Sequence, residues 1–237
     1  MKLGDEITSF VEPPHPKGLS IVGDYVKLEP LDVNKHGKQL FEANMEPGGN
    51  ESWDYLPYGP FDNEQGYHQW LKTIQSETDP CFFAIIRVSD QRAVGVASYL
   101  RINPEDGTIE VGHINFSPTL QRTTEATEAM FLMMRWAFEA GYRRYEWKCN
   151  ALNLKSRKAA QRLGLSYEGV FRQATMSKGR NRDTAWFAAI DKEWPSLKVR
   201  FEQYLSSKNF TNEGGPRVSL TELNKPYLYK EDNHEFS

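Results

Sequence analysis

The order of the periodic segments predicts an α+β protein in which helices flank a sheet. Segments that alternate apolar and polar residues, typical of strands, are interleaved with segments of helical spacing. Three strand-like segments follow one another across short turns, which indicates an antiparallel meander. Further along, one helix lies between two strands, so both kinds of element are mixed in the second half. This mixed order is typical of an α+β sheet protein.

The elements can be assigned in order along the chain. Three prolines between residues 13 and 16 predict an irregular arm over residues 1–20. Strands are expected at 25–29, 81–88, 93–102, 108–116, 142–150, 167–176 and 184–190, and helices at 32–44, 62–77, 123–140, 154–163 and 195–206. Asp32 is placed to cap the first helix, and Gly141 ends the long one.

These elements divide the chain into four parts. We expect an N-terminal arm at 1–20, one domain at 21–193, a C-terminal helix at 194–209 and a polar tail at 210–237. The tail lacks apolar periodicity, so we expect that its removal leaves a folded domain. Its Tyr227-Leu228-Tyr229 segment is a candidate for docking, either on the domain or on a partner.

Composition excludes several classes of function. With 29 basic and 32 acidic residues the net charge is −3, so no overall field attracts nucleic acid or an anionic membrane. No segment approaches the ~18 apolar residues of a membrane span, and the N-terminus lacks the apolar run of a secretory signal. Cys81 and Cys149 lie in apolar segments, which suits a reducing compartment. We therefore expect a cytoplasmic protein with neither a nucleic-acid nor a membrane partner.

Several short motifs lie in a fixed order in the second half of the chain. They are Glu110-Val111-Gly112-His113, then Gln121-Arg122-Thr123-Thr124-Glu125-Ala126 with Thr127-Glu128-Ala129, then Asn153-x-x-Ser156, then Leu163-Gly164-Leu165 and Glu168-Gly169. Together they resemble the GCN5-related N-acetyltransferases, and more closely their RimJ/RimL branch, over about residues 22–191. The resemblance implies a mixed, mostly antiparallel sheet that splays between its fourth and fifth strands. It also implies acetyl transfer from acetyl-CoA to an amine, by direct attack in a ternary complex and without a metal.

The resemblance places the diphosphate of acetyl-CoA at the start of the long helix. The residues concerned are Gln121, Arg122, Thr123, Thr124, Glu125 and Ala126. The first amides of a helix lack intrahelical partners and lie at the positive end of its dipole, so they bind anions. Thr124 stands where the family has glycine, but its N–H remains a donor. The alternative is that this segment is simply a polar helix start.

The pantetheine arm is expected beside the preceding strand. By resemblance the arm contacts the backbone of Ile114 and Phe116, and an N–H such as that of Asn115 points at the thioester oxygen. Asn153 orients the arm and Ser156 protonates the leaving thiolate. Asn153 has a simpler alternative role, because it is also placed to cap the next helix through the N–H of Ser156.

Two residues are candidates for the base that takes the proton of the amine. Glu110 lies on the central strand near the expected thioester and is the first candidate, acting directly or through water. His113 is the second. The alternatives are a solvated strand carboxylate for Glu110 and a hydrogen-bonded core histidine for His113.

The acceptor amine is expected among an aromatic loop and a later turn. The candidate contacts are Trp53, Asp54, Tyr55, Tyr58 and Arg182. Aromatic rings and a carboxylate can hold an amine by cation–π contact or an ion pair, although the loop can equally be an ordinary aromatic lid. The acceptor is a protein N-terminal amine, another peptide amine or a small molecule, and a homodimer stays open. The rival to an enzyme is a non-catalytic acyl-CoA-binding module.

Overall fold

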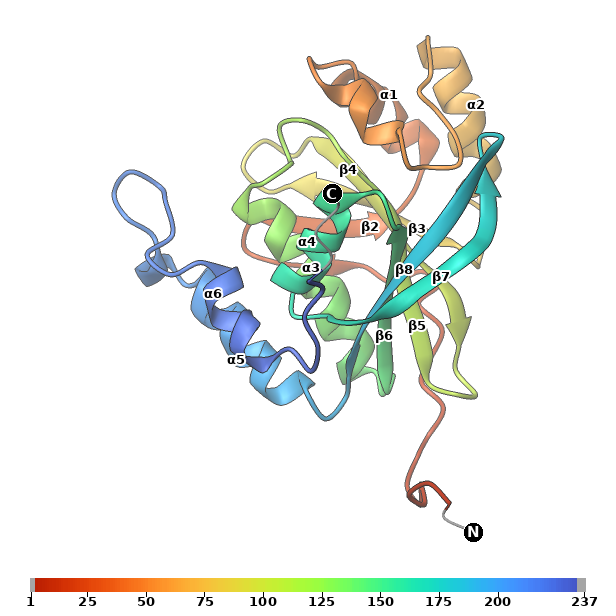
Figure 1. The fold of residues 1–237 in the computed structure, drawn as a ribbon. Coiled ribbons are helices and arrows are strands. Elements are labelled where there is room, and N and C mark those ends of the chain that lie inside the picture. Colours follow the sequence, from red (N-terminus) through yellow and green to blue (C-terminus); the bar gives the residue numbers. More distant parts are fainter. Residues whose placement is uncertain (1–2, 234–237) are drawn as a thin grey trace.

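The protein is described here for residues 3–233 of a computed structural model, and one eight-stranded sheet forms its centre (Figure 1). The sheet order is β1-β2-β3-β4-β5-β6-β8-β7. The strands are β1 (Ile21–Val22), β2 (Val26–Pro30), β3 (Cys81–Arg87), β4 (Ala93–Asn103), β5 (Thr108–Phe116), β6 (Arg144–Asn150), β7 (Ser166–Ser177) and β8 (Arg180–Ile190). This sheet, together with the helices described below, confirms the predicted α+β class.

The helices lie on both faces of this sheet (Figure 1). They are α1 (Val33–Asn44), α2 (Glu64–Ile74), α3 (Thr124–Glu139), α4 (Leu154–Arg162), α5 (Trp194–Leu205) and α6 (Leu220–Asn224), with 3-10 turns at Gly49–Trp53, Ser207–Asn209 and Lys225–Tyr227. The side chain of Asp32 caps α1 by accepting from the N–H of Asn34 at 2.8 Å, as predicted. None of the helices within residues 3–233 is long and apolar enough to cross a membrane.

The sheet opens between β5 and β6, as predicted. These strands run parallel and pair from Thr108 opposite Arg144 to Val111 opposite Trp147. Beyond that point β5 continues beside β4 as far as Phe116, while β6 continues beside β8. Near their carboxyl ends, β5 stays paired with β4 and β6 stays paired with β8, but β5 and β6 no longer pair with each other. The two strands therefore diverge and leave a V-shaped opening between them.

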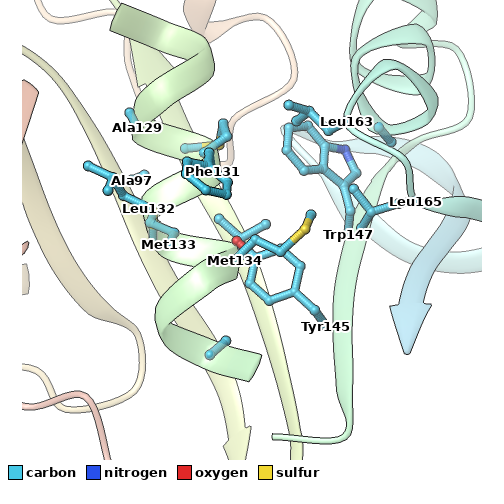
Figure 2. Close-up of a cluster of buried hydrophobic side chains, with 14 of the residues drawn as sticks. Ala97, Ala129, Phe131, Leu132, Met133, Met134, Tyr145, Trp147, Leu163 and Leu165 are labelled. Atoms are coloured by element: carbon cyan, nitrogen blue, oxygen red, sulfur yellow. The ribbon is translucent and has the colours of Figure 1, made fainter. Parts of the chain in front are cut away.

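Two separate cores fix the two faces of the sheet. On one face, α3 contributes Phe131, Met133 and Met134 to a core that also contains Tyr145 and Trp147 of β6 (Figure 2). The methionines are thus core residues, as their helical spacing predicts. On the other face α1 and α2 form a smaller core with alternate residues of β3 and β4. This smaller core does not extend over β5, β6 and β8. On the face turned away from α3, these strands carry mainly polar side chains.

The polar C-terminal segment lies against the domain over residues 210–233, which agrees with the first of the two alternatives for its Tyr227-Leu228-Tyr229 segment, since the N–H of Tyr229 donates to Ser166 Oγ at 2.8 Å. Leu220 and Asn224 of α6 are fully buried against the domain. Further on, the N–H of Tyr167 in β7 donates to the Lys230 carbonyl at 3.0 Å. Asp232 accepts two hydrogen bonds of 2.6 Å from the buried Arg157 of α4. Residues 234–237 lie outside the described part.

Two further details differ from the expected elements. The turn predicted over Ser177–Asp183 is shorter, because β7 and β8 pair as far as Ser177 and Arg180 and leave only Lys178 and Gly179 between them. The N-terminal arm is irregular over residues 3–20, as predicted, and lies on the domain, where Tyr142 donates to the carbonyl of Pro14 at 3.2 Å. Residues 1–2 are outside the described part.

Candidate active site

The open edge of β5 forms one wall of the V-shaped opening. The N–H of Ser117 donates to β4 at 3.1 Å, and Asn115 lies opposite a β4 residue. Hydrogen bonds alternate along an antiparallel pair, so the N–H of Asn115 also points to β4 and that of Phe116 points into the opening. The structure thus corrects the prediction that the Asn115 N–H faces the thioester. Its buried side chain donates instead to Ser52 Oγ at 2.7 Å.

The start of α3 presents the unpaired amides that the sequence predicts there. Thr123 is the N-cap, and its Oγ1 accepts from the N–H of Ala126 at 3.1 Å. Thr124 and Glu125 are the first two helical residues, so their N–H groups have no carbonyl partner within the helix. Thr124 lies in the helical region of backbone conformation, where threonine is tolerated in place of glycine. These residues fit a diphosphate.

The loop before α3 is tightly held at its start. Arg122 has a φ of 63°, a left-handed conformation that is uncommon for residues other than glycine. Gln121 donates from Nε2 to the carbonyl of Phe116 at 2.8 Å and so ties the loop to the end of β5. Arg122 is exposed and directly precedes the N-cap residue Thr123. The predicted cofactor contacts of Gln121 and Arg122 stay predictions.

The start of α4 faces the same opening from β6. Asn153 caps this helix by accepting from the N–H of Ser156 at 3.0 Å, which is the simpler of its two predicted roles. Ser156 Oγ accepts from Trp147 Nε1 at 2.9 Å, which leaves its own proton to donate. Burial raises the pKa of the neighbouring Cys149 thiol to about 11, so this thiol is protonated at neutral pH. Cys149 is therefore not an activated nucleophile.

Glu110 lies on the second face of β5, turned away from α3. Its side chain is only 4% exposed, and its Oε2 accepts from Lys148 Nζ and from Arg101 Nη1, each at 2.8 Å. Burial raises the pKa of this carboxyl, and the two cations partly offset that effect. Oε1 lies near Gly112, where the side chain of Leu100 fills the space that a Cβ would occupy. The Glu110 carboxylate is thus shielded from solvent, and one of its two oxygens is held by cations.

Sequence reasoning missed the charged network that surrounds Glu110. Lys148 also bonds Glu146 at 2.7 Å, and Arg144 bonds Glu146 at 2.6 Å and continues the row to Glu168. Lys148 Nζ lies 3.8 Å from the centre of the Trp186 ring. A signal existed, because Arg144, Glu146 and Lys148 alternate along β6 with the apolar residues of the α3 face. The sequence did not reveal which charges pair.

His113 and Tyr58 form a contact on the same face. Tyr58 Oη lies 2.7 Å from His113 Nδ1, and the two rings stack at 5.7 Å. His113 has a φ of 50° at a bulge in β5, which turns its ring toward α2 and the Tyr58 loop. Burial first, and then the charges of Arg101 and Arg182, lower the pKa of His113 to about 4. His113 is therefore neutral at pH 7.

The aromatic loop contributes less than expected. Trp53 is buried in the smaller core, in contact with Tyr58 and Trp70. Asp54 is exposed, and Tyr55 is exposed with its hydroxyl 3.3 Å from the carbonyl of Leu152. Within this loop the structure brings Tyr58 to the polar face but does not bring Asp54 there.

The β7–β8 hairpin closes the polar face from the other side. Lys178 at its tip donates to the carbonyls of Trp53 and Gly59, each at 2.9 Å, and this contact joins the hairpin to the aromatic loop. Arg182 lies on β8, two residues before Thr184. Thr184 pairs with Asn150, the last residue of β6. Alternation along β8 places Arg182 on the same face as Trp186 and Lys148.

The opening therefore has two different sides. The starts of α3 and α4 lie on the side of the main core, and Glu110, His113, Tyr58 and Arg182 lie on the side of α1 and α2. The two sides meet where β5 and β6 stop pairing. Within residues 3–233 no three His, Cys, Asp or Glu side chains are grouped to hold a metal ion. Such an arrangement suits the transfer of a group between two molecules bound on opposite sides of the sheet.

Comparisons with known proteins agree with this class of site. The family model of the acetyltransferase (GNAT) domain, Acetyltransf_3, matches residues 28–166. A GCN5-related N-acetyltransferase from Brucella melitensis is 40% identical, covering 91% of this chain and 98% of its own, with a TM-score of 0.89. A GNAT-family protein from Chromobacterium violaceum is 39% identical, covering 82% and 98%, with a TM-score of 0.76. The chain belongs to the GNAT acetyltransferase family.

A solved structure with lower sequence identity is similar to this chain in fold alone. Microcin C7 self immunity acetyltransferase MccE, solved with acetyl-CoA and AMP, is 18% identical, covering 71% of this chain and 93% of its own, with a TM-score of 0.62. Comparison with curated proteins gave no significant match. Family membership supports acyl transfer from acetyl-CoA, and it leaves the acceptor to be inferred from the site.

Proposed function

We propose that this protein is an N-acetyltransferase, which moves the acetyl group of acetyl-CoA to the amine of a small molecule or a peptide. One observation carries the proposal. The gap between β5 and β6 has unpaired helix amides on one side and a half-buried cluster of titratable side chains on the other. A binding module needs only the first side. The second side supplies groups that can handle protons.

In the proposed reaction the neutral amine attacks the carbonyl carbon of the thioester, and the carbon–sulfur bond breaks. A free lysine amine, with a pKa of ~10.4, is neutral only about 0.04% of the time at pH 7, and an α-amine about 14%. A base therefore raises the rate. Glu110 takes the amine proton on Oε1, directly or through a water, because Oε2 is held by Lys148 and Arg101.

The leaving thiolate needs a proton in the same reaction. Ser156 donates it, because its oxygen already accepts from Trp147 and its hydroxyl proton remains available. The outward N–H of Phe116 is the candidate donor to the carbonyl oxygen that becomes negative during attack. Solvent then returns the proton to Ser156, and the Glu110 carboxyl releases its proton to water.

The RimJ/RimL branch is part of the same proposal and rests on the motifs between Glu110 and Gly169. A structure from Vibrio cholerae, assigned as a ribosomal-protein-serine acetyltransferase, is 17% identical, which supports the shared fold alone. The chemistry of the site is therefore a better guide to the acceptor than similarity to one branch of the family.

The proposal is tested by amine-dependent release of thiol from acetyl-CoA. The purified protein is screened against peptides with free N-termini, amino acids, polyamines and amine drugs. Release that rises with one class of amine supports the enzyme. Two features favour the rival acyl-CoA-binding module, namely Thr124 at the glycine position and the two cations on Glu110. Tight binding of acetyl-CoA without release for any amine would establish the module instead.

A further inference from the structure

One cation on the polar face differs from all its neighbours. Lys148, Arg144 and Arg101 each have a carboxylate oxygen within 2.8 Å. Arg182 has no salt bridge and no side-chain hydrogen bond to any residue between 3 and 233, and its Nε is buried without a partner. An unpaired charge that is partly removed from water loses hydration and gains nothing in return. The partial burial of this unpaired charge therefore lowers the free energy of unfolding.

The surroundings of Arg182 point to what would pair with it. The titratable groups that act on Arg182 are Cys149, Arg101 and Glu110, and Arg182 acts in turn on His113, so it lies close to the proposed reaction centre. It belongs to the side of the sheet that faces α1 and α2, whereas the starts of α3 and α4 serve the phosphates of the cofactor from the other side. The thioester itself carries no charge. An anion at Arg182 would therefore belong to the acceptor.

We infer that the acceptor amine also carries an anionic group, a carboxylate or a phosphonate-type group, which Arg182 binds. This inference rests on the proposed acetyl transfer and names the class of amine. The planar guanidinium presents several donors in a fixed geometry that matches such oxyanions. Burial lowers the pKa of Arg182, which is the response expected of a guanidinium that has lost water and has no counter-ion. The acceptor supplies that counter-ion, and purely cationic amines such as polyamines are disfavoured.

The same contact would orient the acceptor. Arg182 lies on β8, on the β6 side of the opening, and His113 with Tyr58 lies on the β5 side. An amine whose anionic group is held at Arg182 projects its nitrogen across the opening toward β5, where Glu110 and the thioester are placed. Arg182 is thus a specificity residue, and it takes no part in proton transfer.

The test compares matched acceptors that differ only in the charge of one group. Thiol release from acetyl-CoA is measured for the common amino acids, for their C-terminal amides and for aminoalkylphosphonic acids. We expect at least one acid to exceed its own amide in kcat/KM by roughly 10- to 100-fold, the range of hydrogen bonds to charged groups. The phosphonic acids separate a carboxylate preference from a general anion preference.

Three variants then assign the preference to Arg182. Arg182→Met should remove it by raising the KM of the acid, with the KM of acetyl-CoA unchanged, and Arg182→Lys should restore part of it. Arg172→Met, on the exposed part of β7, is the matched control and should leave the preference intact. The melting temperature of Arg182→Met should not fall, because the side chain has no partner to lose.

The outcomes separate this inference from the proposed function. Equal activity on acids and amides, acceptance only of amines without an anionic group, or an undiminished preference in Arg182→Met would overturn the inference and leave the transferase standing. No thiol release with any amine, despite binding of acetyl-CoA, would reject both.

Discussion

In the proposed reaction, the two sides of the opening between β5 and β6 recognise their ligands by different means. On the cofactor side the recognition groups are backbone amides, at the start of α3 and on the open edge of β5. On the acceptor side they are side chains that reach one face from β4, β5, β6 and β8. Backbone recognition tolerates substitution, and so Thr124 can stand for glycine. Side-chain recognition depends on every member of the set.

The largest expected effect lies on the acceptor side. Glu110→Gln removes basicity and keeps the shape, so turnover should fall by about 10²–10⁴-fold while the affinity for acetyl-CoA stays nearly unchanged. Steady-state kinetics and calorimetry measure the two quantities. Glu168→Gln, at the exposed end of the same charged network, is the control and should retain turnover. A wild-type rate for Glu110→Gln would move the base to His113 or to water alone.

The next effect concerns the support of the cofactor side. Asp232→Asn breaks the buried pair with Arg157 on α4, the helix that carries Ser156. Breaking a buried ion pair by neutralising one of its partners costs about 3–5 kcal/mol of unfolding free energy. Removal of residues 211–237 should therefore destabilise the domain, which reverses the expectation from the polar sequence. Denaturant unfolding measures the change.

A matched control lies in the same segment. Lys225→Met removes an exposed ion pair with Glu231 and should cost about 0–1 kcal/mol. Equal stability of Asp232→Asn and the wild type would show that the C-terminal segment only rests on the surface.

The third prediction uses the pH dependence of stability at His113. Its pKa is lowered to about 4 in the fold, so the neutral form stabilises the protein above the unfolded pKa of about 6.5. This stability is lost as the pH falls from about 6.5 toward 4, up to about 3 kcal/mol in total. His113→Asn cannot titrate and tolerates a positive φ, so its unfolding free energy should fall less over that window.

A second histidine contributes to the wild-type slope. Burial also lowers the pKa of His36, which lies on α1 away from the opening. His36 is present in both proteins, and so the difference between wild type and His113→Asn reports His113 alone. Identical slopes would mean that His113 is more hydrated than its surroundings indicate.

The smallest expected effect tests the tolerance of the backbone side. Thr124→Pro deletes one N–H donor and should weaken acetyl-CoA binding by about tenfold. Thr124→Ala, which deletes only the hydroxyl, should bind more tightly than proline, and Thr124→Gly should equal or exceed threonine. Calorimetry gives the ranking. Proline is tolerated at the first helical position, so the fold should survive. Proline binding as well as threonine would place the diphosphate elsewhere.

Much of the fold was predictable because its signals are local. The periodicity of α3, the cap at Asp32 and the strand order around the meander each depend on residues close in sequence. The helix start at Thr123 is equally local, and so the sequence predicted its unpaired amides. The length of the β7–β8 hairpin was underestimated, because its polar residues do not look like a strand until they pair.

The acceptor side was predicted less well because its contacts are distant in sequence. Glu110 was predicted as the first candidate base, with a solvated strand carboxylate as the alternative, and its partners Arg101 and Lys148 became evident only when three strands were aligned. The exposed Asp54 shows the reverse error, since a loop carboxylate near aromatic residues looks like a ligand for an amine but points to solvent.

The sequence by itself determined the α+β class and the helix start at Thr123, which follow from backbone geometry that short motifs and periodicity encode. The opening between β5 and β6 was implied by the family resemblance. Tertiary structure alone decided which charges pair, that residues 210–233 belong to the domain, and that Arg182 remains without a partner among residues 3–233. The physical reason is that the energy of a charge depends on its burial and on the groups within a few ångströms of it, and neither is written in the residues beside it.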